Sequence, residues 1–235
     1  MASPVRRAAR AAFPATIPIL AGFTFLGAAY GIYMTSLGFH PIFPILMSFF
    51  IFAGSIEFIT ANLLLMAFAP FQAFLLAIMV NARHLFYGLS MLEKYHSVGK
   101  KKLYLIFGMC DESFSINYTA KPDSTIDKGW FMFFVTLYNH MYWVGGSTLG
   151  AVLGQFITFN TDGLLFVMTA LFVVIFLENW LQEKRHTSAM IGLVASVAAL
   201  MIFGANQFVI PAMIGILIIL IAFRKPLERR EVKPL

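Results

Sequence analysis

The sequence predicts an all-α integral membrane protein that crosses the bilayer several times. Of its 235 residues, 60% are apolar and only 12% carry a charge, whereas soluble domains are about 25% charged. One helical span needs roughly 20 apolar residues, so the apolar content is sufficient for about seven spans. A water-soluble enzyme is therefore excluded, and we expect a single transmembrane transporter domain over residues 1–235.

Eight apolar runs follow one another along the chain, which predicts about six to eight transmembrane or half-membrane helices. Turn-forming or charged residues separate the runs. A segment inside the bilayer must satisfy its own backbone hydrogen bonds, and the alternating pattern of a barrel strand is absent, so each run is predicted to be helical. The runs are 14–37, 41–68, 70–92, 103–119, 129–157, 163–182, 188–204 and 207–223.

Lysine and arginine predict the orientation, because the cytoplasmic loops of membrane proteins are enriched in both. Basic residues gather before residue 14, at 94–102 and after residue 223, while the connection at 38–44 contains none. Both termini and the 94–102 loop are therefore expected in the cytoplasm. These short clusters indicate membrane topology, and no nucleic acid is expected as a partner.

This orientation requires that one of the first three runs does not cross completely, since three crossings would put the 94–102 loop outside. The best candidate is the run 41–68, which Pro41, Pro44 and Gly54 interrupt. Non-helical backbone at membrane depth is tolerated where protein or a water-filled cavity surrounds it. A broken or re-entrant helix is therefore predicted here, and such helices often form the substrate sites of transporters.

Small residues recur in a pattern that predicts both helix contacts and an internal repeat. The segment 26–31 (Leu-Gly-Ala-Ala-Tyr-Gly) matches 149–154 (Leu-Gly-Ala-Val-Leu-Gly), and Gly-x3-Gly steps of this kind are usually contact faces between helices. The order of the matches predicts two repeat halves of opposite orientation, at 14–119 and 129–223, as in many transporters.

The strongest candidate site is the segment 81–88 (Asn-Ala-Arg-His-Leu-Phe-Tyr-Gly), in the middle of an apolar run. The guanidinium of Arg83 can bind a carboxylate with two hydrogen bonds, and the imidazole of His84 can change charge between pH 5 and 8. Together with Asn81 and Tyr87, these groups suit the binding of an amino-acid carboxylate and the relay of a proton.

The adjacent carboxylates Asp111 and Glu112 are a second pair of charges inside an apolar run. Charges at membrane depth are costly and usually functional, and two neighbouring carboxylates can share a proton. We therefore expect them to form a titrating group with His84. The alternative is that Arg83 pairs permanently with one of them and locks two helices together.

Residues 52–58 (Phe-Ala-Gly-Ser-Ile-Glu-Phe) are the second candidate site. Gly54 and Ser55 allow a helix to break, which frees backbone groups to meet a zwitterion, and either these carbonyls or Glu57 would receive an ammonium group. The alternative is a tight helix crossing through small residues. Aromatic residues are expected to line a pocket for an aliphatic side chain: Phe52, Phe58, Phe86 and Tyr87.

These motifs resemble the AzlC family of bacterial branched-chain amino acid permeases and exporters. The resemblance rests on Phe-Ala-Gly-x-x-x-Phe at 52–58, Asn-x-Arg-His-x-x-Tyr-Gly at 81–88 and Asp-Glu-x-Phe at 111–114. It implies proton-driven export of leucine, isoleucine, valine and methionine through the bacterial inner membrane, with a small AzlD-type membrane protein as partner. The family commonly has glutamine where this chain has Glu57, which bears on substrate selectivity.

Two other kinds of function are compatible with the same residues. One is an importer or a passive channel for small amino acids, because a static site does not encode direction. The other is an intramembrane metalloenzyme that uses His84, His140, Asp111 and Glu112 as ligands. No His-Glu-x-x-His spacing is present, so we expect no metal, no cofactor and no enzymatic activity.

Overall fold

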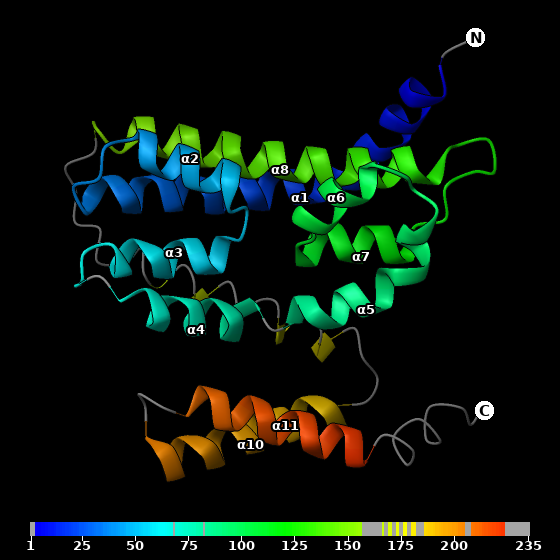
Figure 1. Ribbon diagram of the computed structural model, residues 1–235. Coiled ribbons are helices and arrows are strands. Elements are labelled where there is room, and N and C mark those ends of the chain that lie inside the picture. The colour runs from blue at the N-terminus through cyan, green and yellow to red at the C-terminus, as the bar shows by residue number, and fades with distance from the viewer. Residues whose placement is uncertain are drawn as a thin grey trace. The chain divides into compact units, whose positions relative to one another are not determined.

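The computed structural model describes residues 3–67, 69–81, 83–156, 166, 169–170, 173, 176–177, 180–181, 186–204 and 208–223. Every regular element within these ranges is an α-helix (Figure 1), which agrees with the predicted all-α class. The chain divides into two compact units, Met1–Met168 and Thr169–Leu235. The basic segment after residue 223 lies outside the described residues.

The helix boundaries follow the apolar runs closely. In the first unit the described helices are α1 (Pro4–Ser36), α2 (Ile42–Phe50), α3 (Gly54–Leu63), α4 (Pro70–Asn81), α5 (Arg83–His96), α6 (Lys101–Phe107), α7 (Asp111–Thr119) and α8 (Lys128–Leu153). In the second unit they are α10 (Thr187–Phe203) and α11 (Val209–Ala222), which pack against each other.

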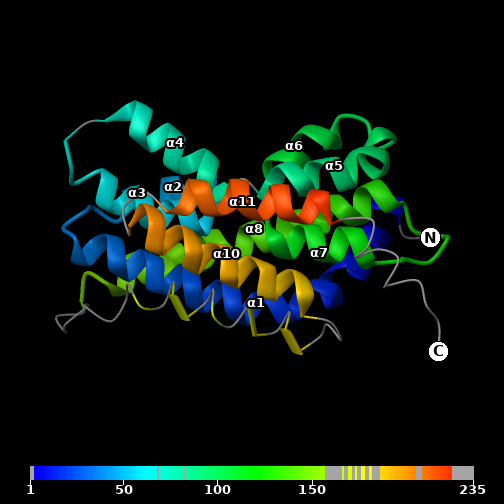
Figure 2. The ribbon, with the colours of Figure 1, turned by 90° about the horizontal axis from the view of Figure 1, so that it is seen from below.

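The two long helices α1 and α8 form the central pair of the first unit and run in the same direction, side by side (Figure 1, Figure 2). Near their starts, the Tyr138 hydroxyl donates a hydrogen bond to the carbonyl of Ala9. Near their ends, Gly154 packs against Thr35. Among the described helices, α1 alone has the length and apolar character expected of a membrane span.

Glycines allow the backbones of α1 and α8 to touch. A Cβ atom on Gly150 would lie 2.0 Å from the carbonyl oxygen of Ala28, and one on Gly31 would lie 2.3 Å from the carbonyl oxygen of Ser147. A larger residue would therefore meet backbone, which cannot move aside as a flexible side chain can. The prediction that the Gly-x3-Gly steps are helix contact faces is confirmed.

The parallel course of α1 and α8 also corrects part of the predicted repeat. Inverted halves would place the matching segments 26–31 and 149–154 on helices of opposite direction, whereas they lie on parallel helices that pack on each other. Their similarity has a simpler cause, because both segments need small residues for the same close contact. The second predicted half, 129–223, is described only in part.

Helices α2 and α3 form a hairpin that turns at residues 51–53, inside the run in which a broken helix is predicted. The chain enters α2 from the end of α1, and near the end of α3 Asn62 accepts a hydrogen bond from Tyr33, close to the end of α1. The turn contains Phe52, whose φ of 48° lies in the left-handed region that residues other than glycine rarely adopt.

Helices α6 and α7 form a second hairpin, which turns at residues 108–110 and lies at the other end of the α1–α8 pair (Figure 1). Its α6 begins beside the start of α8, where Lys101 lies over the ring of Trp130. Its α7 returns toward the same end, since Asn117 donates a hydrogen bond to Thr136 of α8.

The two hairpins meet tip to tip at the middle of α8. Phe52 from the first turn lies close to Gly108 of the second turn, and its ring is 4.4 Å from the ring of His140. The Nε2 of His140 donates a hydrogen bond to the carbonyl of Phe49, and its Nδ1 bonds to the hydroxyl of Tyr104 in α6. His140 is therefore a packing residue with both nitrogens satisfied, and it joins the two turns.

The remaining helices, α4 and α5, cover these hairpins: α4 packs on α3, and α5 packs on α6. The described part of α4 ends at Asn81, and α5 is described from Arg83. A shared hydrophobic cluster brings together Ala12 of α1, Val98 after α5 and Phe131 of α8. The start of α1, the 94–102 loop and the start of α8 therefore lie at one end of the unit, as the predicted orientation requires.

Candidate functional site

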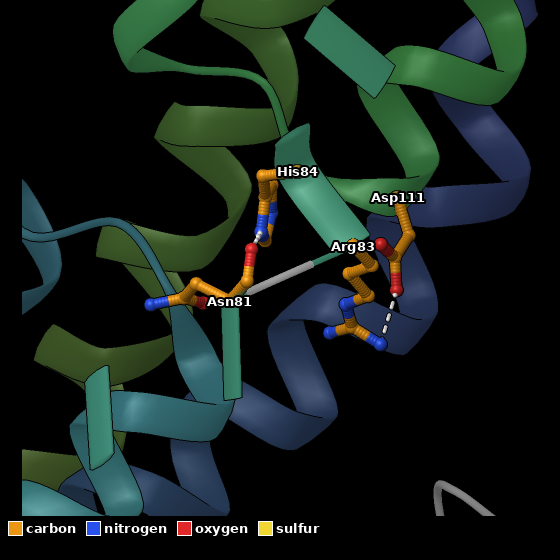
Figure 3. Close-up of polar contacts among 4 residues, drawn as sticks. All are labelled: Asn81, Arg83, His84 and Asp111. Atoms are coloured by element: carbon orange, nitrogen blue, oxygen red, sulfur yellow. Dashed lines mark hydrogen bonds and ion pairs between the residues drawn. The ribbon is translucent and has the colours of Figure 1, made fainter. Parts of the chain in front are cut away.

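An ion pair joins Arg83 and Asp111, two of the predicted site residues (Figure 3). Arg83 begins α5 and Asp111 begins α7, and the distance from Nη1 to Oδ2 is 3.0 Å. A carboxylate on the first turn of a helix is further stabilised by the helix dipole. The exposed fraction of the side chain is 35% for Arg83 and 24% for Asp111, so a ligand can reach the pair. Within the described residues it is the single ion pair.

Asn81 and His84 lie beside this pair but point away from it (Figure 3). The Nδ1 of His84 is 3.1 Å from the carbonyl oxygen of Asn81. Because a carbonyl only accepts hydrogen bonds, Nδ1 must carry the hydrogen, and in the neutral ring Nε2 is then the acceptor. His84 is thus held in a defined tautomer, next to Arg83 in the chain.

Tyr87 and Glu112 complete the predicted cluster. Tyr87 interacts electrostatically with Asp111 and stacks on Phe114 of α7, with ring centroids 4.3 Å apart, so it fixes α5 against α7. Glu112 is half-buried and interacts electrostatically with both Asp111 and Arg83. The structure therefore brings together Arg83, Asp111, Glu112 and Tyr87, at the starts of two helices.

Glu57 belongs to a different and fully buried environment. Its side chain has no exposed surface. Trp143 Nε1 donates to both of its carboxylate oxygens, at 3.1 and 3.2 Å, and the backbone N–H of Ala53 donates to Oε1 at 2.9 Å. The carboxylate thus ties the first turn of α3 to the hairpin turn before it and to α8. In this conformation it has no open face toward a substrate.

Gly54 and Ser55 lie on the first turn of α3, where a helix break was predicted to free backbone groups. Gly54 packs against the indole of Trp143, and a Cβ at this position would come within 2.8 Å of the ring. Ser55 is half-buried. These small residues serve the close packing of α3 on α8 at the point where the helix begins.

An apolar cavity of about 620 Å³ lies between α3 and α4. Its wall includes Ile51 and Ala53 from the hairpin turn, Thr60 from α3 and, at the far end of α4, Asn81. Because Asn81 is two residues before Arg83, the cavity reaches the neighbourhood of the ion pair. It is large enough for an aliphatic amino-acid side chain.

The aromatic residues predicted to line such a pocket lie elsewhere. Phe52 and Phe58 are buried in the core with Trp143, and Phe86 is half exposed. The cavity wall consists instead of smaller aliphatic residues together with Phe74. An aromatic ring in an apolar run is as useful for packing as for binding, and sequence spacing alone does not separate the two roles.

Sequence reasoning missed several polar residues that the fold places next to the site. Ser113 and Asn117, one turn apart on α7, face α8 and bond to Asn139 and Thr136. Their spacing of four residues, matched by polar residues on α8, is the signal that could have identified this face. Cys110 joins the same group through a contact from Sγ to the Ser113 hydroxyl.

The described residues offer no metal site, because no three histidine, cysteine, aspartate or glutamate side chains lie close enough to hold an ion. The ligands of the metalloenzyme alternative are separated: His140 is bound between the hairpins, while His84, Asp111 and Glu112 lie at the starts of α5 and α7.

The fold and this site define a helical protein whose interrupted helices meet at an internal charged centre. The protein belongs to the AzlC family, whose model, described as AzlC protein, matches residues 18–157. The match extends from α1 through the end of α8 and so includes both hairpins and the ion pair.

Known relatives agree with this assignment. The chain is 65% identical to "Branched-chain amino acid transport protein AzlC" of Bacillus subtilis, over 98% of this chain and 91% of that protein. It is 52% identical to an "Uncharacterized membrane protein" of Haemophilus influenzae, over 93% and 90%, and 28% identical to "Inner membrane protein YgaZ" of Escherichia coli, over 77% and 78%. No solved structure matches the chain. The protein is therefore a membrane protein of an amino-acid transport family.

Proposed function

We propose that the protein is a secondary transporter that exports the branched-chain amino acids leucine, isoleucine and valine, and also methionine, in exchange for protons. The observation that carries this proposal is the partly exposed Arg83–Asp111 pair at the start of α7, together with the apolar cavity that extends to Asn81, two residues before Arg83. The printed name of the Bacillus subtilis relative supports the substrate class.

In the proposed complex, the substrate carboxylate binds the guanidinium of Arg83 in place of Asp111. The two groups have the same charge and geometry, so one can substitute for the other on the planar guanidinium. The branched side chain enters the cavity between α3 and α4, where Asn81 contributes one polar contact. Burial of such a side chain contributes about 1.5–3 kcal/mol.

The substrate ammonium group then lies near the turn between α2 and α3. Ile51 and Ala53 line the cavity there, and carbonyls of unwound backbone are common ligands for cations in transporters. We favour these carbonyls over Glu57, because Trp143 and Ala53 already occupy the Glu57 oxygens. Glu57, Gly54 and Ser55 would then hold the turn in the shape that the substrate needs.

Proton coupling follows from the competition for Arg83. When the substrate takes the guanidinium, Asp111 loses its cation while Glu112 remains beside it. Two neighbouring carboxylates without a counter-ion hold a proton between them. The proposed donor of that proton is His84, whose ring lies edge-on to that of Tyr87 and whose side chain would turn toward the pair. For exchange, this proton enters from the outside as the substrate leaves, and it is released to the cytoplasm when Asp111 pairs with Arg83 again.

The proposed orientation places both termini and the 94–102 loop in the cytoplasm, with the whole chain acting as one transporter. The hairpin α2–α3 would enter the bilayer from the outside and the hairpin α6–α7 from the cytoplasm, so the ion pair lies near the midplane. A small AzlD-type membrane protein is the proposed partner, and co-purification of the two chains after joint expression tests it.

The central test measures efflux of labelled valine from loaded membrane vesicles containing the protein. Arg83→Ala should reduce efflux at least about 30-fold, because loss of one hydrogen bond to a charged group costs about 2 kcal/mol. Lys102→Ala removes a positive charge at a distance from the pair and should retain full efflux. If Arg83→Ala transports as well as the natural protein at equal abundance, the proposed role of Arg83 is wrong.

The direction of transport needs a separate measurement. Imposing an inward proton gradient on the same vesicles should accelerate valine efflux, and collapsing the gradient with a protonophore should remove the acceleration. An importer would instead accumulate valine, and a passive channel would respond to the valine gradient alone.

A further inference from the structure

A second cavity, of about 780 Å³, opens at the end of the first unit where α5, α6, α7 and α8 begin or end. It lies on the side of the loop 94–102, at the opposite end of α5 from Arg83, and it shares no lining residue with the apolar cavity. Its wall carries four lysines and one aspartate, a net formal charge of +3. The lysines are Lys94, Lys101, Lys121 and Lys128.

The single carboxylate in the wall does not neutralise these lysines. Asp127 caps α8, because its Oδ1 accepts a hydrogen bond from the backbone N–H of Trp130 at 2.8 Å. Lys94 donates to the last carbonyls of α7, at Asn117 and Tyr118, and no carboxylate lies within ion-pair distance of any lysine in the wall. The positive charge of the cavity is therefore uncompensated within the described residues.

The lysines come from four separate segments and converge on one space. Lys94 lies near the end of α5, Lys101 begins α6, Lys121 follows α7 and Lys128 begins α8. Mutual repulsion of four ammonium groups disfavours this arrangement unless an anion enters. One polyvalent anion in the cavity would hold four helix ends together.

We propose that this cavity binds a phosphate group, supplied by the headgroup of an anionic lipid or by a soluble phosphate. A phosphate offers several acceptor oxygens to separate lysine donors, and lysine recognises phosphate as a point charge. The transported amino acid does not fit this role, because a zwitterion has no net charge to match a +3 wall. Basic pockets between membrane helices on the cytoplasmic side are known to bind anionic headgroups.

The shape of the wall is compatible with the lipid source. Beside the lysines the wall includes Val98, Phe131 and Met132, which are largely buried and form an apolar floor of small exposed area. The cavity also lies at the start of α8, one of the two long helices of the unit, where headgroups are expected if α8 crosses the bilayer.

The test uses the full chain in detergent and measures binding of phosphatidylglycerol, phosphatidylcholine and inorganic phosphate by native mass spectrometry. The cavity variant carries Lys121→Gln and Lys128→Gln, two exposed lysines in the wall. The matched control carries Lys100→Gln and Lys102→Gln, which remove the same charge from the neighbouring loop outside the wall. Thermal unfolding of each variant verifies that the fold is retained.

We expect the natural protein to prefer phosphatidylglycerol over phosphatidylcholine, and the cavity variant to bind phosphatidylglycerol about 30-fold more weakly, at about a factor of five for each lysine. The control should change less than about twofold. If inorganic phosphate binds and displaces phosphatidylglycerol, with the same loss in the cavity variant, the ligand is a soluble phosphate.

Two results would overturn the proposal. Equal weakening in the cavity variant and in the control would mean that diffuse charge, and not this cavity, attracts the anion. Absence of any preference for phosphatidylglycerol, together with no binding of inorganic phosphate, would mean that the cavity does not recognise phosphate.

Discussion

The contact between α1 and α8 and the meeting point of the two hairpins are built on opposite principles. Along α1 and α8, small residues bring the backbones together until no side chain fits between them, as at Gly150 and Ala28. At the hairpin tips the helices are interrupted, and charged and aromatic side chains such as Arg83 and Phe52 fill the space.

The difference shows how one chain combines a rigid support with a responsive site. Close packing of small residues does not tolerate larger side chains, because any added atom must displace backbone. The interrupted helices instead leave a half-exposed ion pair and a cavity that a ligand can enter. Substitutions in the first region should therefore affect folding, and substitutions in the second should affect transport.

The largest effect is expected at the α1–α8 contact. Gly150→Ala would place a methyl group 2.0 Å from the carbonyl oxygen of Ala28, and relief of that clash should cost about 3 kcal/mol of stability. Gly145, on the same helix, has no atom within 4 Å of the corresponding position. Gly145→Ala should therefore be neutral or stabilising by up to about 1 kcal/mol.

Thermal unfolding of the purified variants in detergent measures this contrast. A Gly150→Ala protein as stable as the Gly145→Ala control would show that α1 and α8 are not packed as described.

A smaller effect, on transport and not on folding, is expected from exchanging the charges of the ion pair. Asp111→Asn should lower valine efflux about 30-fold, because the carboxylate that competes with the substrate and takes the proton is gone. The double variant Arg83→Asp with Asp111→Arg should match the natural protein in abundance but not in efflux, since the arginine that binds the substrate carboxylate then lies on α7 instead of α5.

Measuring abundance and efflux together separates this expectation from a structural ion pair that only locks two helices. For such a lock, the exchanged pair would restore both quantities.

The smallest effect is expected at the turn between α2 and α3. Phe52→Ala and Phe52→Gly both remove the ring that packs on His140. Residue 52 has a left-handed backbone conformation, with φ at 48°. Glycine adopts this conformation without strain, whereas it costs other residues roughly 1–2 kcal/mol. The glycine variant should therefore be about 1 kcal/mol more stable than the alanine variant. Equal unfolding temperatures would mean that the turn is not held in this conformation.

Much of the fold could be predicted, because long apolar runs in the sequence identify membrane helices. The break in the run 41–68 was predicted from prolines, a glycine and the placement of lysines, and the turn lies at residues 51–53. The corresponding turn at 108–110 was not predicted. Gly108 and Cys110 are compatible with a continuous helix, and only packing against Thr136 and Phe52 requires a turn there.

The candidate site could be predicted only as a set of residues. Arg83 and Asp111 were each identified as charges inside apolar runs, and their pairing was one of two alternatives that the sequence left open. Glu57 was grouped with them because it is also a charge in an apolar run. Its bonds to Trp143, 86 positions away along the chain, could not be predicted from spacing on its own helix.

The sequence by itself determined the helical class, the apolar runs that form the helices and the residues that carry charge into apolar surroundings, because these depend on local composition and on periodicity along one segment. The tertiary structure decided which charges meet, that α1 and α8 run parallel, and that four lysines share one cavity. These features depend on contacts between segments distant along the chain, where backbone approach and side-chain volume select one packing among many.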